Sequence, residues 1–248
     1  VERALSAESL SILSLGAELT NQQDMGGYLR QVVPGLIDRW GMVNASAAMR
    51  YYDEQRSIYL AARSATLDRQ VRQNQRRRAD RFARARLQAQ VYTARMPEFN
   101  AIRKAEPVIG FGMQMFNQFG FDRMRQDVTN AMTRAVASYN RDTMLYNSAL
   151  DSAVVKVQRV AEPSACGFCR TLAFKSWRAD TGKDGIRTAD YAIDFHSNCR
   201  CSIETLYEGD EPIRPEYYDQ FEREYEQASS DREPGQTVIE RMNQLARP

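Results

Sequence analysis

The chain has 248 residues, of which 43% are hydrophobic and 27% are charged, and its formal net charge at pH 7 is +2. This length and composition suffice for one large domain or two smaller ones, and they exclude a wholly disordered chain, a collagen and a coiled-coil rod. No stretch approaches 18 consecutive apolar residues, so we expect no membrane-spanning segment.

The small net charge hides a separation of charge along the chain. Residues 1–165 carry a balance of +7, whereas residues 166–248 carry −5. Of the 34 basic residues, 30 are arginines, which form bidentate contacts with phosphate and carboxylate groups. We therefore expect the two parts of the chain to have different binding partners.

The first 150 residues have the periodicity of helices. Apolar residues from Leu5 to Leu19 recur at spacings of three, four and seven, which places them on one helical face. A second helical region runs from about Tyr28 to Tyr59, and Pro34-Gly35 and Gly41 are expected to interrupt it.

A third amphipathic stripe follows later in this part. Apolar residues from Phe121 to Tyr139 step by three and four, which predicts a long helix. The Gly- and Phe-rich stretch from Pro107 to Phe121 is interpreted as a connection between helices.

An arginine-rich helix is expected over residues 63–95, which hold ten arginines and two aspartates. Such a cluster can neutralise nucleic-acid phosphates, but it is also typical of a solvated helix or of one docked on an acidic protein surface. No aromatic ladder or known DNA-binding motif accompanies it, so we expect no reading of base sequence. The candidate nucleic-acid contacts are Arg72, Arg76, Arg77, Arg78, Arg81 and Arg84.

The character of the sequence changes after Pro163. An alternating run over residues 201–207 predicts a strand. From residue 209 onward the chain is acidic, with possible helices over 216–228 and 237–245. These segments hold too few apolar residues to fold alone, so we expect them to pack on a partner or on the helical part.

All four cysteines and the single histidine lie between residues 166 and 201. Two thiols separated by two residues can bind one ion, and a second pair from a nearby turn or strand completes a tetrahedron. Either both cysteine pairs bind the metal, or the histidine replaces one cysteine of the second pair. The candidate ligands to a structural zinc ion are Cys166, Cys169, His196, Cys199 and Cys201.

Four cysteines and a histidine also permit other uses. Two disulfides would also account for four cysteines, but no signal peptide is recognisable and thiols made in a reducing compartment stay reduced. A redox pair or a Cys–His nucleophile would leave the remaining thiols unexplained. A catalytic zinc would need an open coordination position and a general base, for which Asp190 and Asp194 are the nearest candidates in sequence. We interpret the cluster as a staple for a small, loop-rich segment.

The run Cys166-Gly167-Phe168-Cys169-Arg170-Thr171-Leu172-Ala173, followed by Phe195-His196-Ser197-Asn198-Cys199-Arg200-Cys201, resembles the Mu F-like minor head proteins of tailed bacteriophages. The resemblance implies a virion protein of head morphogenesis, present in several copies at the portal vertex or on the inner capsid face. It implies contacts with the portal protein, the major capsid protein and packaged DNA, with assembly in the host cytoplasm. The five Cys and His candidates are the positions that match the motif.

We therefore predict a mainly α protein. An extended helical part over residues 1–150 is followed by a small, zinc-stapled α+β module over 151–208 and an acidic tail over 209–248. We expect a structural role rather than an enzymatic one. The alternatives are a zinc-stapled protein that binds nucleic acid without sequence specificity, and a metal-dependent hydrolase.

Overall fold

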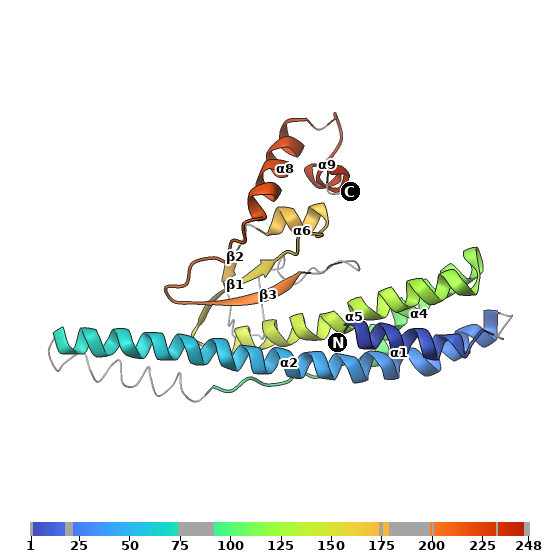
Figure 1. The fold of residues 1–248 in the computed structure, drawn as a ribbon, viewed down its shortest axis with the longest axis horizontal. Coiled ribbons are helices and arrows are strands. Elements are labelled where there is room, and N and C mark those ends of the chain that lie inside the picture. The colour runs from blue at the N-terminus through green and yellow to red at the C-terminus, as the bar shows by residue number, and fades with distance from the viewer. Residues whose placement is uncertain are drawn as a thin grey trace. The chain divides into compact units, whose positions relative to one another are not determined.

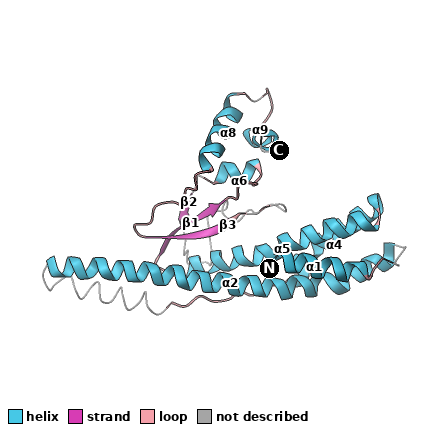
Figure 2. Cartoon of the chain, in the orientation of Figure 1, coloured by secondary structure: helices cyan, strands magenta, loops and turns pink. Residues whose placement is uncertain are grey.

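The structure is a computed structural model that describes residues 2–17, 22–73, 92–173, 176–178, 199, 201–231 and 233–245. It is mainly helical, with one small antiparallel sheet (Figure 2). None of the described helices combines the length and the apolar character that a bilayer crossing requires. The chain divides into two compact units, and the fold class predicted from the sequence is confirmed.

The first unit, called here the helical unit, is built mainly from residues Val1–Ala48 and Met96–Thr143. It contains α1 (Glu2–Ser14), the first part of α2 (Gln22–Gln73), α4 (Ala101–Phe119) and the first part of α5 (Phe121–Leu150). These helices lie alongside one another (Figure 1). Their apolar faces form one core, made of Leu13, Met25, Leu29, Val33, Leu36, Ile37, Ala45, Ala105, Val108, Ile109, Met124, Val128, Ala131, Met132 and Tyr139.

The expected interruptions of the second helical region do not occur. Pro34 and Gly41 both lie inside α2, which is continuous over 52 residues. The helix continues through Pro34 because buried Val33, Leu36 and Ile37 hold both of its flanks in the core. Gly41 has a packing role, since a Cβ at this position would lie 2.6 Å from the ring of Tyr139.

The stretch expected as a connection over residues 107–121 is also helical. It forms most of α4, whose buried residues Ala105, Val108, Ile109 and Gly112 follow a helical period. The side chain of Asn100 caps the helix by accepting a hydrogen bond from the backbone N–H of Arg103. Glycines favour a connection in the sequence pattern, but a helix packed on its neighbours tolerates them.

The amphipathic stripe over residues 121–139 is confirmed. It occupies the first two thirds of α5, where Met124, Val128 and Tyr139 are completely buried. Gly120, with φ of +81°, separates α5 from α4. A left-handed backbone of this kind favours glycine.

The second unit, called here the sheet unit, comprises mainly Met49–Arg95, Met144–Asp194 and Cys201–Pro248. Its three strands are β1 (Val154–Val160), β2 (Ser176–Arg178) and β3 (Ser202–Tyr207), with β1 in the middle and both pairings antiparallel. The strand predicted over residues 201–207 is thus confirmed as β3. Three shorter helices belong to this unit: α6 (Gly167–Leu172) lies between β1 and β2 in the chain, and α8 (Tyr218–Ser230) and α9 (Val238–Leu245) follow β3.

The arginine-rich helix does not extend to Arg95 as predicted. In the described residues α2 ends at Gln73, and residues 92–100 form neither helix nor strand. Side chains satisfy the backbone of this segment in place of helical hydrogen bonds. The amide of Asn147 pairs with both the N–H and the carbonyl of Arg95, at 2.7 and 2.8 Å, and the Asp53 carboxylate accepts from the N–H of Ala94 at 2.8 Å.

A buried ion pair joins α2 to the end of α5 in the sheet unit. The Nε of Arg56 lies 2.6 Å from a carboxylate oxygen of Asp151, and the two side chains are 5% and 1% exposed. The hydroxyl of Tyr52 donates to the same carboxylate at 3.2 Å. Burial and the adjacent carboxylate raise the pKa of the Tyr52 hydroxyl far above its usual range, so it stays a donor at any ordinary pH.

Replacing the carboxylate of this pair should strongly destabilise the sheet unit. In Asp151→Ala the buried Arg56 guanidinium loses its ion-pair partner, and we expect the free energy of unfolding to fall by about 3–5 kcal/mol. Chemical denaturation followed by circular dichroism measures the change. The control is Glu222→Gln. It breaks an exposed ion pair between Glu222 of α8 and Arg214, and it should have little effect on the free energy of unfolding. Equal effects of the two substitutions would contradict the importance of the buried pair.

Candidate metal centre

The first cysteine pair lies on a short helix. Cys166 is the N-cap residue of α6 and is partly exposed, whereas Cys169 lies in the first turn and is 1% exposed. Leu172, three residues further along, is also buried, so the helix places Cys169 on its buried face.

The second pair approaches from the start of the sheet. Cys201 immediately precedes β3, and Cys199 lies two residues earlier in the chain. Both are 2% exposed. Ile203 is buried as well and lies two residues after Cys201. The alternation of an extended chain therefore directs the side chains of Cys201 and Ile203 to the same face of the sheet.

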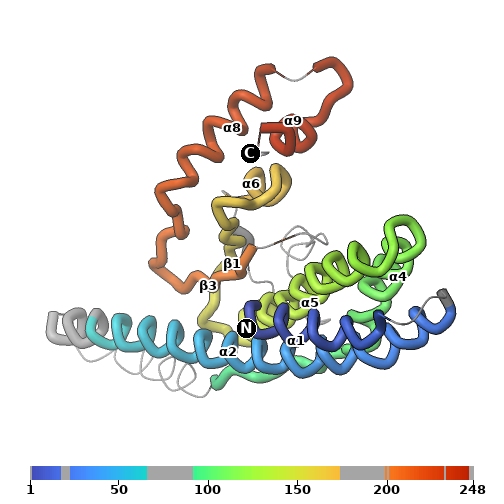
Figure 3. The backbone as a smooth tube through the Cα atoms, turned by 45° about the vertical axis from the view of Figure 1, so that its right-hand side comes forward, coloured from blue at the N-terminus to red at the C-terminus, as the bar shows by residue number. Residues whose placement is uncertain are grey.

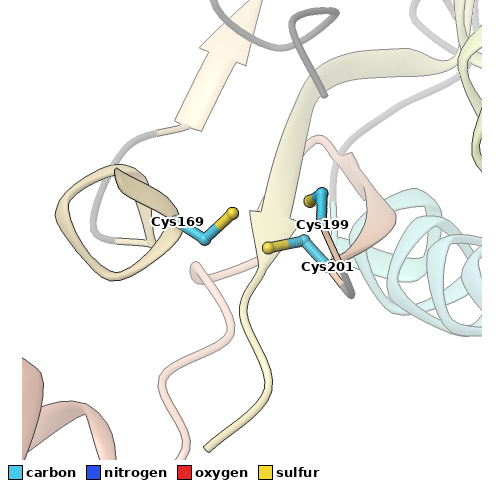
Figure 4. Close-up of side chains that lie close together, drawn as sticks. All are labelled: Cys169, Cys199 and Cys201. Carbon is cyan, nitrogen blue, oxygen red and sulfur yellow. The ribbon is translucent and has the colours of Figure 1, made fainter. Parts of the chain in front are cut away.

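The structure brings three thiols together. The sulfur atoms of Cys169, Cys199 and Cys201 all lie within 4.8 Å of one another (Figure 4). The sulfurs of Cys169 and Cys201 point toward each other, one from α6 and the other from the edge of β3 (Figure 4). All four cysteines lie in the described residues, and no two of them are joined in a disulfide.

Helix α8 fastens α6 through Arg170, the residue after Cys169. The Arg170 guanidinium pairs with Glu224 of α8, stacks on Phe221 at 4.7 Å and donates to the carbonyl of Ala165 at 2.7 Å. The side chains of Arg170 and Glu224 are only 6% and 13% exposed, so solvent screens their attraction weakly.

Two tyrosines of the same region hold the segment between β1 and α6. The hydroxyl of Tyr217 donates to the carbonyl of Ala161, and the N–H of Ala161 donates to the hydroxyl of Tyr218, both at 2.9 Å. Burial raises the pKa of Tyr218 to about 12, so this hydroxyl remains neutral at physiological pH.

Helix α9 completes the enclosure of α6. The N–H of Gly167 donates to the side chain of Asn243 at 2.8 Å, and a Cβ on Gly167 would lie 2.6 Å from the backbone nitrogen of Asn243. Glycine is therefore required between the two cysteines for α9 to approach. Helices α6, α8 and α9 lie next to one another (Figure 3), so the predicted tail helices are confirmed and pack on the cysteine module itself.

Several predicted site residues are placed differently or lie outside the described residues. Cys166 is not one of the three gathered thiols. His196 lies outside the described residues, as do Asp190 and Asp194. Arg72 is part of α2, but its side chain is not among those described, and the remaining predicted nucleic-acid contacts lie outside the described residues: Arg76, Arg77, Arg78, Arg81 and Arg84.

Sequence reasoning missed one residue of the centre, Arg159. It lies on β1 with no exposed surface, and one of its terminal N–H groups donates to the sulfur of Cys169 at 3.8 Å. An arginine in the valine-rich run over residues 154–160 was the available signal, because an apolar strand rarely places a charge inward without a partner.

The donor set suits a soft or borderline cation. In a tetrahedral zinc site with Zn–S bonds of about 2.3 Å, the sulfurs lie about 3.8 Å apart, and the three thiols here lie within 4.8 Å of one another. Thiolates select zinc, copper(I) or iron over magnesium and calcium, which prefer oxygen ligands. The cluster can therefore hold a metal ion. The same motif contains two further candidate ligands, Cys166 and His196.

Comparison with known proteins identifies the family to which the chain belongs. No curated protein and no solved structure matches the chain. The family described as VG15 protein matches residues 3–228, which include the helical unit, the cysteine cluster and almost all of α8. The match covers most of the sequence, and the chain belongs to the VG15 family of phage proteins.

Proposed function

We propose that this chain is a structural protein of the virion of a tailed phage, a minor capsid protein that acts in head morphogenesis. Two observations support the proposal: membership of the VG15 family, and the resemblance of residues 166–173 and 195–201 to the Mu F-like minor head proteins. The partners expected on this proposal are the portal protein, the major capsid protein and packaged DNA, with several copies per virion.

We propose further that the cysteine cluster holds one structural zinc ion. Cys169, Cys199 and Cys201 supply three ligands, and Cys166 or His196 supplies the fourth. A catalytic ion needs a coordination position that substrate can reach, whereas the three gathered thiols are each only 1–2% exposed. Their burial supports a staple between α6 and β3 rather than an enzyme.

Metal content tests the staple directly. Protein purified without added metal should contain one zinc per chain by elemental analysis and native mass spectrometry, and a strong chelator should remove the ion and unfold the cysteine module. Cys169→Ser and Cys201→Ser should each lose the ion, because each removes a buried ligand.

Three further variants sharpen this test. Ser202→Ala changes a neighbour of Cys201 and should keep the ion, whereas comparison of Cys166→Ser with His196→Ala identifies the fourth ligand. A wild-type protein without metal, or full metal content in Cys169→Ser, would overturn the zinc centre.

The arginine-rich segment is the proposed contact with DNA. The triple variant R76A/R77A/R78A should weaken DNA binding and reduce the slope of log affinity against log salt by about 2.7, because three phosphate contacts release fewer counterions. Fluorescence anisotropy with a DNA duplex at several salt concentrations gives the slope. The control R50A/R103A/R223A removes the same charge from exposed positions on α2, α4 and α8. Equal loss in the two triples would show a net-charge effect and contradict a defined contact.

The virion itself tests the structural role. Gradient-purified particles of the phage that encodes this chain should contain it at far fewer copies than the major capsid protein, as measured by quantitative mass spectrometry. Particles assembled without it should have defective heads in electron micrographs. Its absence from purified particles would contradict the proposal, and DNA binding without incorporation would favour a nucleic-acid-binding protein instead.

A further inference from the structure

A groove of about 630 Å³ lies between α2 and the start of α4 in the helical unit. Gly35 and Asp38 line it from α2, and Glu98, Phe99 and Ile102 line it from the segment that enters α4. A Cβ on Gly35 would meet no atom within 4 Å, so the groove is open above the helix. Its volume falls in the range of sites that hold small ligands, and a long side chain with its flanking backbone fits such a space.

The groove is negatively charged. Asp38 and Glu98 are both exposed, and neither carboxylate has an ion-pair or hydrogen-bond partner among the described residues. No lysine or arginine belongs to the described residues that line the groove. The N-terminal end of α4 contributes the equivalent of about half a positive charge. It offsets only part of the two carboxylate charges, so the groove favours a cation.

An aromatic pair beside the groove already binds one cation of the chain. The ring of Phe99 stacks on the ring of Tyr139, with 4.0 Å between their centres. The ammonium group of Lys104 lies 5.9 and 5.2 Å from these two ring centres, and it donates to the carboxylate of Asp142 at 2.7 Å. This is a complete cation–π site with its own carboxylate. The two carboxylates of the groove lie beside Phe99 without a corresponding cation.

The hydroxyl of Tyr139 adds an unused hydrogen-bonding group to this region. Tyr139 is completely buried, and its hydroxyl has no hydrogen-bond partner among the described residues. Burial and the nearby carboxylates of Asp38 and Asp142 raise the pKa of this hydroxyl to about 12, so it stays neutral. Its oxygen can accept a hydrogen bond. A donor that pairs with Asp38 therefore approaches a second, unsatisfied acceptor.

The chemistry of the groove selects a guanidinium over an ammonium group. A planar guanidinium can pair with a carboxylate through two N–H groups and lie against an aromatic ring at the same time, whereas an ammonium acts as a point charge. The two carboxylates repel phosphate groups, so nucleic acid is not a ligand of this groove.

We propose that the groove binds the arginine-rich segment of a second copy of this chain. Residues 72–84 contain six arginines and one aspartate, so the segment and the groove are complementary in charge. Each copy carries one segment and one groove, and the contact is therefore heterologous and can join successive copies into a ring or a row. The proposal goes beyond the structural role described above, and it requires neither the zinc ion nor DNA.

The first experiment removes the charge of the groove. Binding of a fluorescein-labelled peptide of residues 72–84 to the full chain is measured by fluorescence anisotropy at low salt. D38N/E98Q should weaken binding about tenfold, the loss expected for two partly solvated ion pairs. The control E54Q/E106Q removes the same charge from exposed positions outside the groove and should stay within about twofold of the wild type. A peptide with lysine in place of every arginine should also bind more weakly.

The second experiment fills the groove without changing its charge. Gly35 and Gly27 are both exposed glycines of α2 at which a Cβ would meet no atom within 4 Å, but only Gly35 lines the groove. Leucine has the higher helix propensity, so both leucine variants should fold. G35L should weaken peptide binding as strongly as D38N/E98Q, whereas G27L should bind the peptide like the wild type.

Self-association tests the identity of the partner. Sedimentation velocity of the full chain, purified free of nucleic acid, should show association that increases with concentration. D38N/E98Q, G35L and the arginine variant R76A/R77A/R78A should each reduce this association. The two groove variants should keep the DNA affinity of the wild type, and circular dichroism checks that every variant folds.

Each outcome decides one part of the proposal. Loss of peptide binding and of self-association in D38N/E98Q and G35L, but not in their controls, supports the interface between copies. Equal loss in the controls, or no loss in the groove variants, overturns the groove as a binding site. Peptide binding by a chain that stays monomeric overturns the second copy as the partner. Metal content and the salt dependence of DNA binding are measured separately, so the proposed function stands or falls on its own tests.

Discussion

The gathering of the Cys169, Cys199 and Cys201 thiols is the constraint that holds α6 beside the start of β3. A helix of six residues and three short strands bury too little apolar surface to be stable as an independent unit. The proposed metal ion would link these elements over a loop of about thirty residues, and such a cross-link restricts the unfolded chain considerably. The helices α8 and α9 then cover α6, with the Arg170–Glu224 pair and the Gly167–Asn243 contact fixing their positions.

The acidic segment over residues 209–248 has a different role in the structure from the one its composition indicates. By composition it is a solvated tail, with too few apolar residues for a core of its own. Three of its large apolar residues are nevertheless buried: Tyr218, Phe221 and Met242 are each no more than 1% exposed. The acidic residues stay outside, apart from Glu224, which is paired. The segment is thus part of the cysteine module rather than an appendage to it.

Local pattern predicted those parts of the fold in which the pattern and the packing agree. The stripe over residues 121–139, the strand at 201–207 and the two helices of the tail all have a period that burial reinforces. Prediction failed where a side chain distant in the sequence decides the local structure. Gly41 is explained only by the Tyr139 ring, and residues 92–95 leave the helical state because Asn147 and Asp53 satisfy their backbone groups. For the same reason spacing alone could not distinguish Cys166 from the three gathered thiols, nor identify Arg159 as their neighbour.

The contact between Gly167 and Asn243 also bears on the order of events during synthesis. The two residues are 76 positions apart, so the cysteines leave the ribosome well before the helix that covers α6 exists. While α9 is missing, one side of the Cys-x-x-Cys turn remains open to solvent and to small ions. An ion could therefore enter during translation, and its release would become slow once α9 has packed. Retention would then be controlled by opening of the C-terminal helix rather than by the strength of the metal–sulfur bonds alone.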